Sequence, residues 1–102
     1  MTAIIFGGFD WDEGNKGKCQ KHGVSMKVIE SFFENDVLIA PDLKHSDKEP
    51  RFLAIGESAS GRPMIVVFTI RKRRNETLIR PISARYMHDK EAKKYRKKRS
   101  EI

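Results

Sequence analysis

The chain has 102 residues, of which 38% are hydrophobic and 34% are charged, and this length permits one domain with a single core and excludes a second. Its longest apolar run, residues 64–68, is far shorter than the roughly 20 residues that a membrane-spanning helix needs, and no secretory signal is recognised at its start. The single cysteine, Cys19, cannot form an internal disulfide, and no Cys/His spacing indicates a metal site. We therefore expect one domain over residues 1–102 in a reducing cytoplasm, with no cofactor.

The positive charge is concentrated in the last third of the chain. Lys and Arg total 21 against 14 Asp and Glu, which gives a net charge of +7. Residues 1–70 carry 8 basic and 10 acidic side chains, whereas residues 71–102 carry 13 basic and 4 acidic ones, a net charge of +9. This asymmetry is typical of proteins that bind a polyanion, most commonly RNA or DNA, or an acidic protein. The alternative is a lysine-rich helix whose charged face is merely solvated.

A short strand and two helices are predicted in the first third of the chain. Residues 3–11 favour a strand that a pair of glycines interrupts. Acidic residues followed by lysines predict a helix over about 12–22, which Gly23 ends. Ser25 can cap a second helix reaching about residue 34, because apolar side chains recur there at helical spacing.

An antiparallel meander and a basic helix are predicted in the remainder. The expected strands are residues 37–40, 51–55, 64–70 and 77–84. Residues 64–70 are apolar on both faces and should lie centrally. Pro81 places the last strand at an edge or requires a bulge in it. A helix begins at about His88, and its lysine-rich tail from about residue 96 is expected to be its most weakly held part. The fold class is therefore α+β, with helices on one face of the sheet and the other face partly open.

Scattered polar side chains suit the transesterification of RNA phosphodiesters. In this reaction a base removes the 2′-hydroxyl proton, an acid protonates the leaving 5′-oxygen, and cations stabilise the charge on phosphorus without a metal. The acid–base candidates are His22, His45 and Glu49. Arginine grips two phosphate oxygens and stays charged, so Arg80 and Arg85 are the candidates for phosphate or transition-state contact. The candidates for RNA binding are Lys21, Arg51, Arg71, Lys72, Arg73 and Arg74.

Each candidate also has a structural explanation. His22 can cap the end of the first helix, while His45 and Glu49 belong to a loop in which polar residues are common. Arg80 and Arg85 are separated by an odd number of positions, so a regular strand would direct them to opposite faces. A bulge near Pro81 would bring them to the same face.

Six groups of residues occur in an order known from one protein family. They are Phe9-Asp10-Trp11-Asp12, residues 18–25, Pro41-Asp42 with His45-Ser46, Arg51-Phe52 before Ile55-Gly56, Gly61-Arg62-Pro63 before residues 67–69, and residues 79–85. Together they resemble the BrnT toxins of bacterial type II toxin–antitoxin systems, from Phe9 to about Tyr95. Pro81 departs from the family pattern, in which an aliphatic residue is common.

The resemblance implies a RelE-like fold in which an antiparallel meander packs against two N-terminal helices and a basic helix follows. It also implies a ribonuclease that arrests translation and a BrnA-like antitoxin that neutralises it, in a complex of two toxins and two antitoxins. Operator DNA would be bound only through the antitoxin. The sequence thus predicts a metal-independent endoribonuclease toxin. The alternative is a non-catalytic module that binds RNA or protein with the same basic face.

Overall fold

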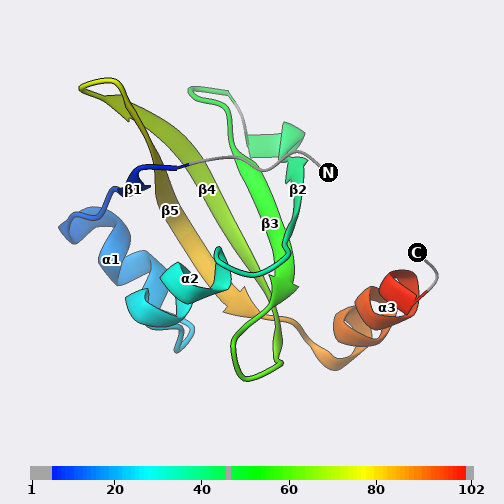
Figure 1. Cartoon of the computed structure of the whole chain (residues 1–102). Helices are drawn as coiled ribbons and strands as arrows, with labels where there is room; N and C mark the ends of the chain where they lie inside the picture. Colours follow the sequence, from blue (N-terminus) through cyan, green and yellow to red (C-terminus); the bar gives the residue numbers. More distant parts are fainter. Residues whose placement is uncertain (1–5, 46, 101–102) are drawn as a thin grey trace.

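A computed structural model describes residues 6–45 and 47–100 and shows an α+β fold (Figure 1). The strands are β1 (Gly8–Phe9), β2 (Leu38–Pro41), β3 (Phe52–Glu57), β4 (Pro63–Arg73) and β5 (Glu76–Tyr86). The helices are α1 (Glu13–Gln20), α2 (Met26–Phe32) and α3 (Asp89–Ser100), and a short 3-10 turn, η1 (Leu43–His45), follows β2. The strand order across the single sheet is β1-β5-β4-β3-β2.

The sheet is mixed, which corrects the prediction of a purely antiparallel one. Strands β2 to β5 form the predicted meander, and β4 lies at its centre as expected. β1, however, runs parallel to β5, with Gly8 opposite Leu78 and Phe9 opposite Ile79. The backbone N–H groups of Gly7 and Asp10 extend this contact by donating to carbonyls of β5. The predicted N-terminal strand therefore exists but is shorter, and residues 3–5 of it lie outside the described residues.

β5 carries a bulge next to its proline, which was one of the two predicted alternatives. Phe68 of β4 lies opposite Pro81, whereas the preceding residue Val67 lies opposite Ser83. Ile82 is therefore the extra residue of the bulge. Proline has no N–H group to donate to a neighbouring strand, so an irregular position of this kind accommodates it.

The bulge decides where the two candidate arginines of β5 lie. Arg80 is opposite Thr69 and Arg85 is opposite Ile65 on β4. Thr69 and Ile65 are four residues apart on a regular strand, so they share one face of the sheet. Arg80 and Arg85 consequently lie on that same face, about 13 Å apart along the strand.

The core lies between the sheet and helices α1 and α2. Its fully buried side chains are Cys19, Val24, Ile29, Phe32, Ala54, Met64, Val66, Phe68, Ile79 and Ala84. Phe33, the C-cap residue of α2, joins the layers, because its ring contacts those of Phe9, Phe32 and Phe68 at centroid distances of 5.3 to 5.8 Å. Aromatic pairs of this geometry add about 0.5–1.5 kcal/mol each beyond the burial of their area.

A buried asparagine fastens the start of α1 to the bulge of β5. The Asn15 side-chain oxygen accepts from the N–H of Asp12 (2.8 Å), and the Asp12 carboxylate accepts from the N–H of Asn15 (3.1 Å), which completes a capping box. The Asn15 amide nitrogen donates to the carbonyls of Asp10 (2.9 Å) and Pro81 (2.8 Å). One side chain thus fixes the positions of β1, α1 and β5 relative to one another.

The connection between the helices follows the sequence prediction closely. α1 ends at Gln20, and residues 21–23 form a turn in which Gly23 has φ +80°, a conformation that glycine adopts at little cost. The Ser25 hydroxyl caps α2 by accepting from the N–H of Val28 at 3.1 Å.

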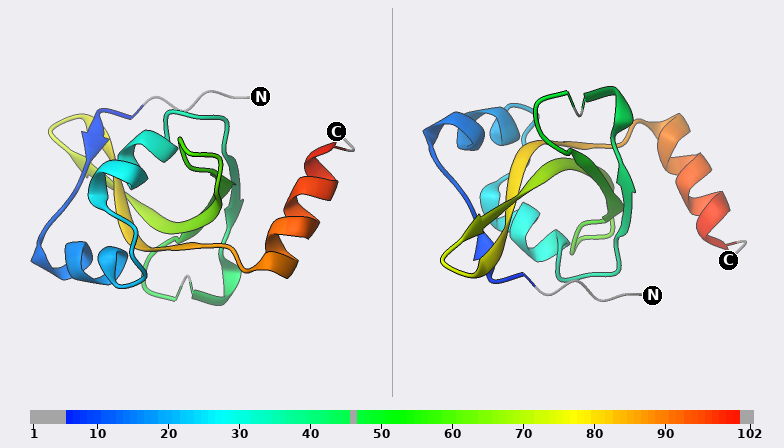
Figure 2. Two further views of the ribbon diagram at one scale, coloured as in Figure 1. Left: turned by 90° about the horizontal axis from the view of Figure 1, so that it is seen from below. Right: turned by 90° about the horizontal axis from the view of Figure 1, so that it is seen from above.

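α3 stands on the opposite side of the molecule from α1, in every view of Figures 1 and 2. Among its described residues only Ala92 is buried, and Tyr95 is half-buried. The helix extends through Ser100 and thus includes the lysine-rich residues from 96 onward. Because it buries so little apolar surface, charged contacts contribute much of its attachment.

Candidate active site

The loop between β2 and β3 brings three of the predicted site residues together. His45, Glu49 and Arg51 line a pocket of about 290 Å³ with Lys44, Asp47 and Lys48. Arg71 of β4 joins them, because its guanidinium donates to the Glu49 carboxylate at 2.6 Å. We call His45, Glu49, Arg51 and Arg71 the loop cluster.

Backbone contacts hold this loop against the sheet. The Thr69 hydroxyl of β4 donates to the carbonyl of Pro50 at 2.6 Å, and the N–H of Asp42 donates to the carbonyl of Arg51 at 2.8 Å. The second bond closes the loop at its base, just where β2 ends and β3 begins. The loop cluster therefore has a defined geometry although it lies between strands.

His45 contacts a carboxylate that the sequence prediction did not include. Its ring nitrogen Nδ1 lies 3.0 and 3.2 Å from the two carboxylate oxygens of Asp42. The Asp42 side chain is 13% exposed, whereas that of His45 is 65% exposed. The two residues are three positions apart, which is the spacing of one helical turn, so η1 brings them together.

Arg80 is held by two carboxylates. Its guanidinium lies 3.4 Å from an oxygen of Asp10 and 3.0 Å from an oxygen of Asp12, and Arg73 approaches Asp10 at 3.5 Å. The backbone N–H of Asn15, with Arg80 as a further cause, lowers the pKa of Asp12 below its usual value. Arg80 is only 18% exposed, so in this structure it joins the β1–α1 connection to β5.

Arg85 is paired with the first turn of α3. Its two terminal nitrogens donate to the two Glu91 oxygens at 2.7 and 2.9 Å. Glu91 also accepts from the N–H of His88 at 3.0 Å. The Arg85 hydrogen bonds, followed by the His88 N–H, lower the pKa of Glu91 to about 2, and the same contact raises the pKa of Arg85. This two-pronged geometry is the one that a guanidinium also uses to bind phosphate.

His22 and Lys21 lie far from the loop cluster. Both belong to the exposed turn between α1 and α2. In Figure 1 this turn lies at the end of the molecule opposite to η1 and the loop that follows it. The structure therefore does not bring His22 and His45 to one site.

The basic hairpin between β4 and β5 lies at the same end of the sheet as the loop cluster (Figure 1). The predicted turn over residues 71–76 is shorter in the structure, because β4 continues through Arg73 and β5 begins at Glu76. The two residues between them, Arg74 and Asn75, both have positive φ, 48° and 69°, as in the tight hairpin turns whose twist matches the strands. Lys72, Arg73 and Arg74 are exposed there.

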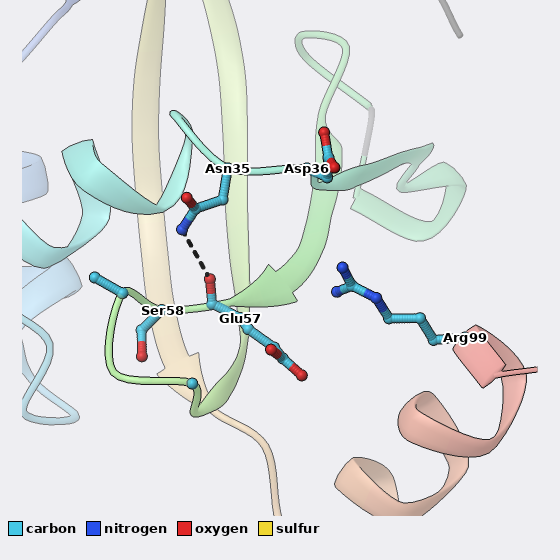
Figure 3. A pocket seen from close by; sticks show the side chains of 7 residues that line it. Asn35, Asp36, Glu57, Ser58 and Arg99 are labelled. Atoms are coloured by element: carbon cyan, nitrogen blue, oxygen red, sulfur yellow. Dashed lines mark hydrogen bonds between the residues drawn. The ribbon is translucent and has the colours of Figure 1, made fainter.

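A second, larger pocket has the wrong charge for a phosphate. It has a volume of about 450 Å³, and Asp36 and Glu57 contribute acidic groups to its wall. Figure 3 shows Arg99 of α3 extending toward these two residues. The hydroxyl of Tyr95, which accepts from Arg99 at 2.6 Å, is the main cause of a raised pKa for Arg99, and the two carboxylates add to it. The pocket therefore receives the C-terminal end of α3.

The family comparison agrees with the resemblance seen in the sequence. The model of the ribonuclease toxin BrnT of type II toxin–antitoxin systems matches residues 11–91. The chain belongs to the BrnT family. The BrnT match runs from the residue before the α1 cap to the first turn of α3, and hence includes the whole loop cluster. Membership of this family of type II toxins implies an antitoxin partner. The comparison with curated proteins found no significant match.

Two further searches of residues 6–45 and 47–100 gave no candidates. No helix in this part of the chain is both long and apolar enough to cross a membrane. No group of three or more His, Cys, Asp or Glu side chains is arranged there to hold a metal ion.

The sequence prediction missed the acidic partners of the basic site residues. Asp42 was detectable, because its spacing from His45 matches one helical turn. Asp10 and Glu91 were not, since their arginines are reached only through the parallel pairing of β1 and the return of α3. No local pattern indicates either contact.

Proposed function

We propose that this BrnT-family protein is a metal-independent endoribonuclease that cleaves RNA through its 2′-hydroxyl groups, acts in the cytoplasm and arrests translation. Family membership supports the ribonuclease activity. The observation that supports the location of the site is the loop cluster, because His45, Glu49 and Arg51 line one pocket together with two lysines, and Arg71 pairs with Glu49. The RelE-like relationship implied by the sequence remains part of this proposal.

The arrangement of cations suggests a path for the RNA backbone. Arg51 and Arg71 would contact the scissile phosphate, and the exposed side chains of residues 72–74 would contact phosphates further along the strand. Glu49 would hold Arg71 in place, because its carboxylate already accepts from that guanidinium. Binding to several phosphates makes affinity fall steeply with salt.

Arg80 and Arg85 would contact phosphate only after they leave their present partners. Each is neutralised by carboxylates of the same chain, so phosphate contact requires an exchange of partners. Arg85 meets that condition more readily, because Glu91 belongs to a helix that buries little surface. Arg80 is bound by two carboxylates and less exposed, which favours a structural role. His22 and Lys21 would contact RNA only at the far end of the molecule.

The test is incubation of the purified protein with cellular RNA in the presence of EDTA. We expect cleavage to persist, and to leave 2′,3′-cyclic phosphate ends. An R71A variant should lose most of the activity, while K93A, which removes an exposed lysine on α3, should not. Cleavage that disappears with the chelator and returns with a divalent ion would refute the metal-independent mechanism.

The same experiment separates this function from the alternative. A non-catalytic module using the same basic face would bind the RNA with a steep dependence on salt and leave it intact. Expression in bacteria without a partner adds a second readout, since a toxin stops growth and a binding module does not.

We further propose that the antitoxin is BrnA-like, forms a complex of two toxins with two antitoxins, and alone contacts operator DNA. Its acidic side chains would face residues 71–74 and α3. The edge strand β2 also supports a protein partner: Leu38 and Ile39 are exposed on it and Leu43 just after it. An uncovered sheet edge with apolar side chains tends to pair with another chain.

A further inference from the structure

His45 lines the loop-cluster pocket and forms a carboxylate–imidazole pair with Asp42 behind it. Both Asp42 oxygens lie within 3.2 Å of His45 Nδ1. The carboxylate is fixed from its own backbone, because the N–H of Asp42 donates to the Arg51 carbonyl and its carbonyl accepts from the N–H of His45 at 3.3 Å. The carboxylate is thus largely buried and anchored, whereas the imidazole beyond it is open to solvent.

This geometry determines which ring nitrogen can react. A carboxylate at Nδ1 favours the tautomer that carries its proton on Nδ1. Nε2 then holds the lone pair and is the nitrogen available to take a proton from another molecule. The carboxylate also stabilises the imidazolium that results. A pair of this kind is suited to general base catalysis.

The other charged groups of the pocket favour the same role. Lys44, Lys48 and Arg51 attract a phosphate to the pocket that His45 lines. Of the two further carboxylates there, Glu49 is already engaged by Arg71. Asp47 lines the pocket as well, and it provides a matched control for the loss of a carboxylate.

We propose that His45 is the general base of the RNA cleavage and that Asp42 is the positioning residue that holds its ring. The 2′-hydroxyl proton passes to His45 Nε2 as the 2′-oxygen forms a bond to phosphorus. The bond from phosphorus to the 5′-oxygen breaks, and this oxygen takes a proton from the ammonium of Lys44 or Lys48, leaving a 2′,3′-cyclic phosphate. The protonated imidazole then returns its proton to solvent, and the amine regains one. This inference rests on the proposed function and names the residues that carry it.

The competing explanation is that Asp42 only stabilises η1. In that case its replacement would lower thermal stability and would reduce activity only as far as it reduces the folded fraction. In the proposed role, the carboxylate orients the ring and stabilises the imidazolium that forms during the reaction. Removing it therefore lowers kcat of the folded protein with little change in KM.

The experiment measures kcat and KM on a short oligoribonucleotide for wild type, H45A, D42N, D42E and the control D47N, each checked for thermal unfolding. We expect H45A to lower kcat about 100-fold or more with little change in KM. D42N should lower kcat with little change in KM, D42E should restore part of the lost kcat, and D47N should resemble wild type.

Three results would overturn the proposal. A fully active H45A beside a wild type that cleaves RNA refutes the assignment of the base but not the ribonuclease activity. A folded D42N variant that keeps the wild-type kcat refutes the positioning role of Asp42. A wild-type protein that binds RNA and never cleaves it refutes the proposed function, and this inference with it.

Discussion

Replacing Asn15 by alanine tests how the fold holds the start of α1 against the bulge. The substitution removes three hydrogen bonds: the acceptor of the Asp12 N–H and the donors to the carbonyls of Asp10 and Pro81. A hydrogen bond contributes about 1 kcal/mol net, and a buried group that loses its partner costs more. Part of this loss is offset where water reaches the exposed side of the site. We therefore expect a loss of about 2–3 kcal/mol from a total stability of roughly 5–15 kcal/mol.

The assay is urea and thermal unfolding of the isolated chain followed by circular dichroism. In a domain of this size, that loss lowers the melting temperature by about 10 °C or more. Gln20→Ala in the same helix is the control, because it removes one exposed hydrogen bond, from the Gln20 amide to the Lys16 carbonyl. Surface substitutions usually change the free energy of unfolding by less than about 0.5 kcal/mol. If the free energies of unfolding of N15A and Q20A differ by no more than this, the reasoning from buried hydrogen bonds is wrong.

Three further predictions concern charge and burial. The pKa of Glu91 is lowered to about 2 in the folded chain from an ordinary 4.5. Its pairing with Arg85 therefore contributes stability above pH 4.5 that is lost as the pH falls toward 2. E91Q should flatten this part of a curve of stability against pH, and an unchanged curve would contradict the pairing. Burial raises the pKa of the Cys19 thiol to about 11, so a thiol reagent at pH 8 should modify it only at the rate of unfolding, and rapid modification of the native chain would show that the core is open there. Charge reversal on the hairpin and α3 should slow association with the antitoxin and flatten its salt dependence, while dissociation changes less; rates unaffected at low salt would place the antitoxin on another surface. The residues reversed are Arg73, Arg74, Lys97 and Lys98.

The elements that the sequence predicted correctly are those with local signals. Ser25 caps α2 and Gly23 ends the preceding turn, because capping and left-handed conformations depend on a few adjacent atoms. The long apolar run of β4 indicated a central strand for a similar reason, since only a strand covered on both sides tolerates it.

The parallel pairing of β1 had no such signal. A strand of two residues carries almost no periodicity, and its partner residues Leu78 and Ile79 lie at the other end of the chain. Only the folded core, in which Phe9 meets Phe33, brings the two segments together. The same long-range packing brings Asp10 to Arg80, which explains why the sequence predicted a phosphate-contacting arginine where the structure has an ion pair.

The candidate site was predictable in its residue types and not in its grouping. His45, Glu49 and Arg51 are close in sequence, and the structure brings them to one pocket. His22 was assigned to the same site on chemistry alone, and the turn that carries it lies at the other end of the sheet (Figure 1). Spacing along the chain determines proximity within a loop, but not between separate elements.

The bulge in β5 determines whether its two arginines lie on the same face of the sheet. Five positions separate Arg80 from Arg85, and only the unpaired residue Ile82 makes this odd interval equivalent to an even one. A substitution at Ile82 leaves the number of residues unchanged, so both arginines stay on that face whatever the new side chain is. A deletion of Ile82 leaves four positions between the arginines, so a regular strand without the bulge keeps both on one face and Ala84 in the core. Shortening β5 at this point therefore preserves the shared face of the two arginines, provided that the bulge is lost with the deleted residue.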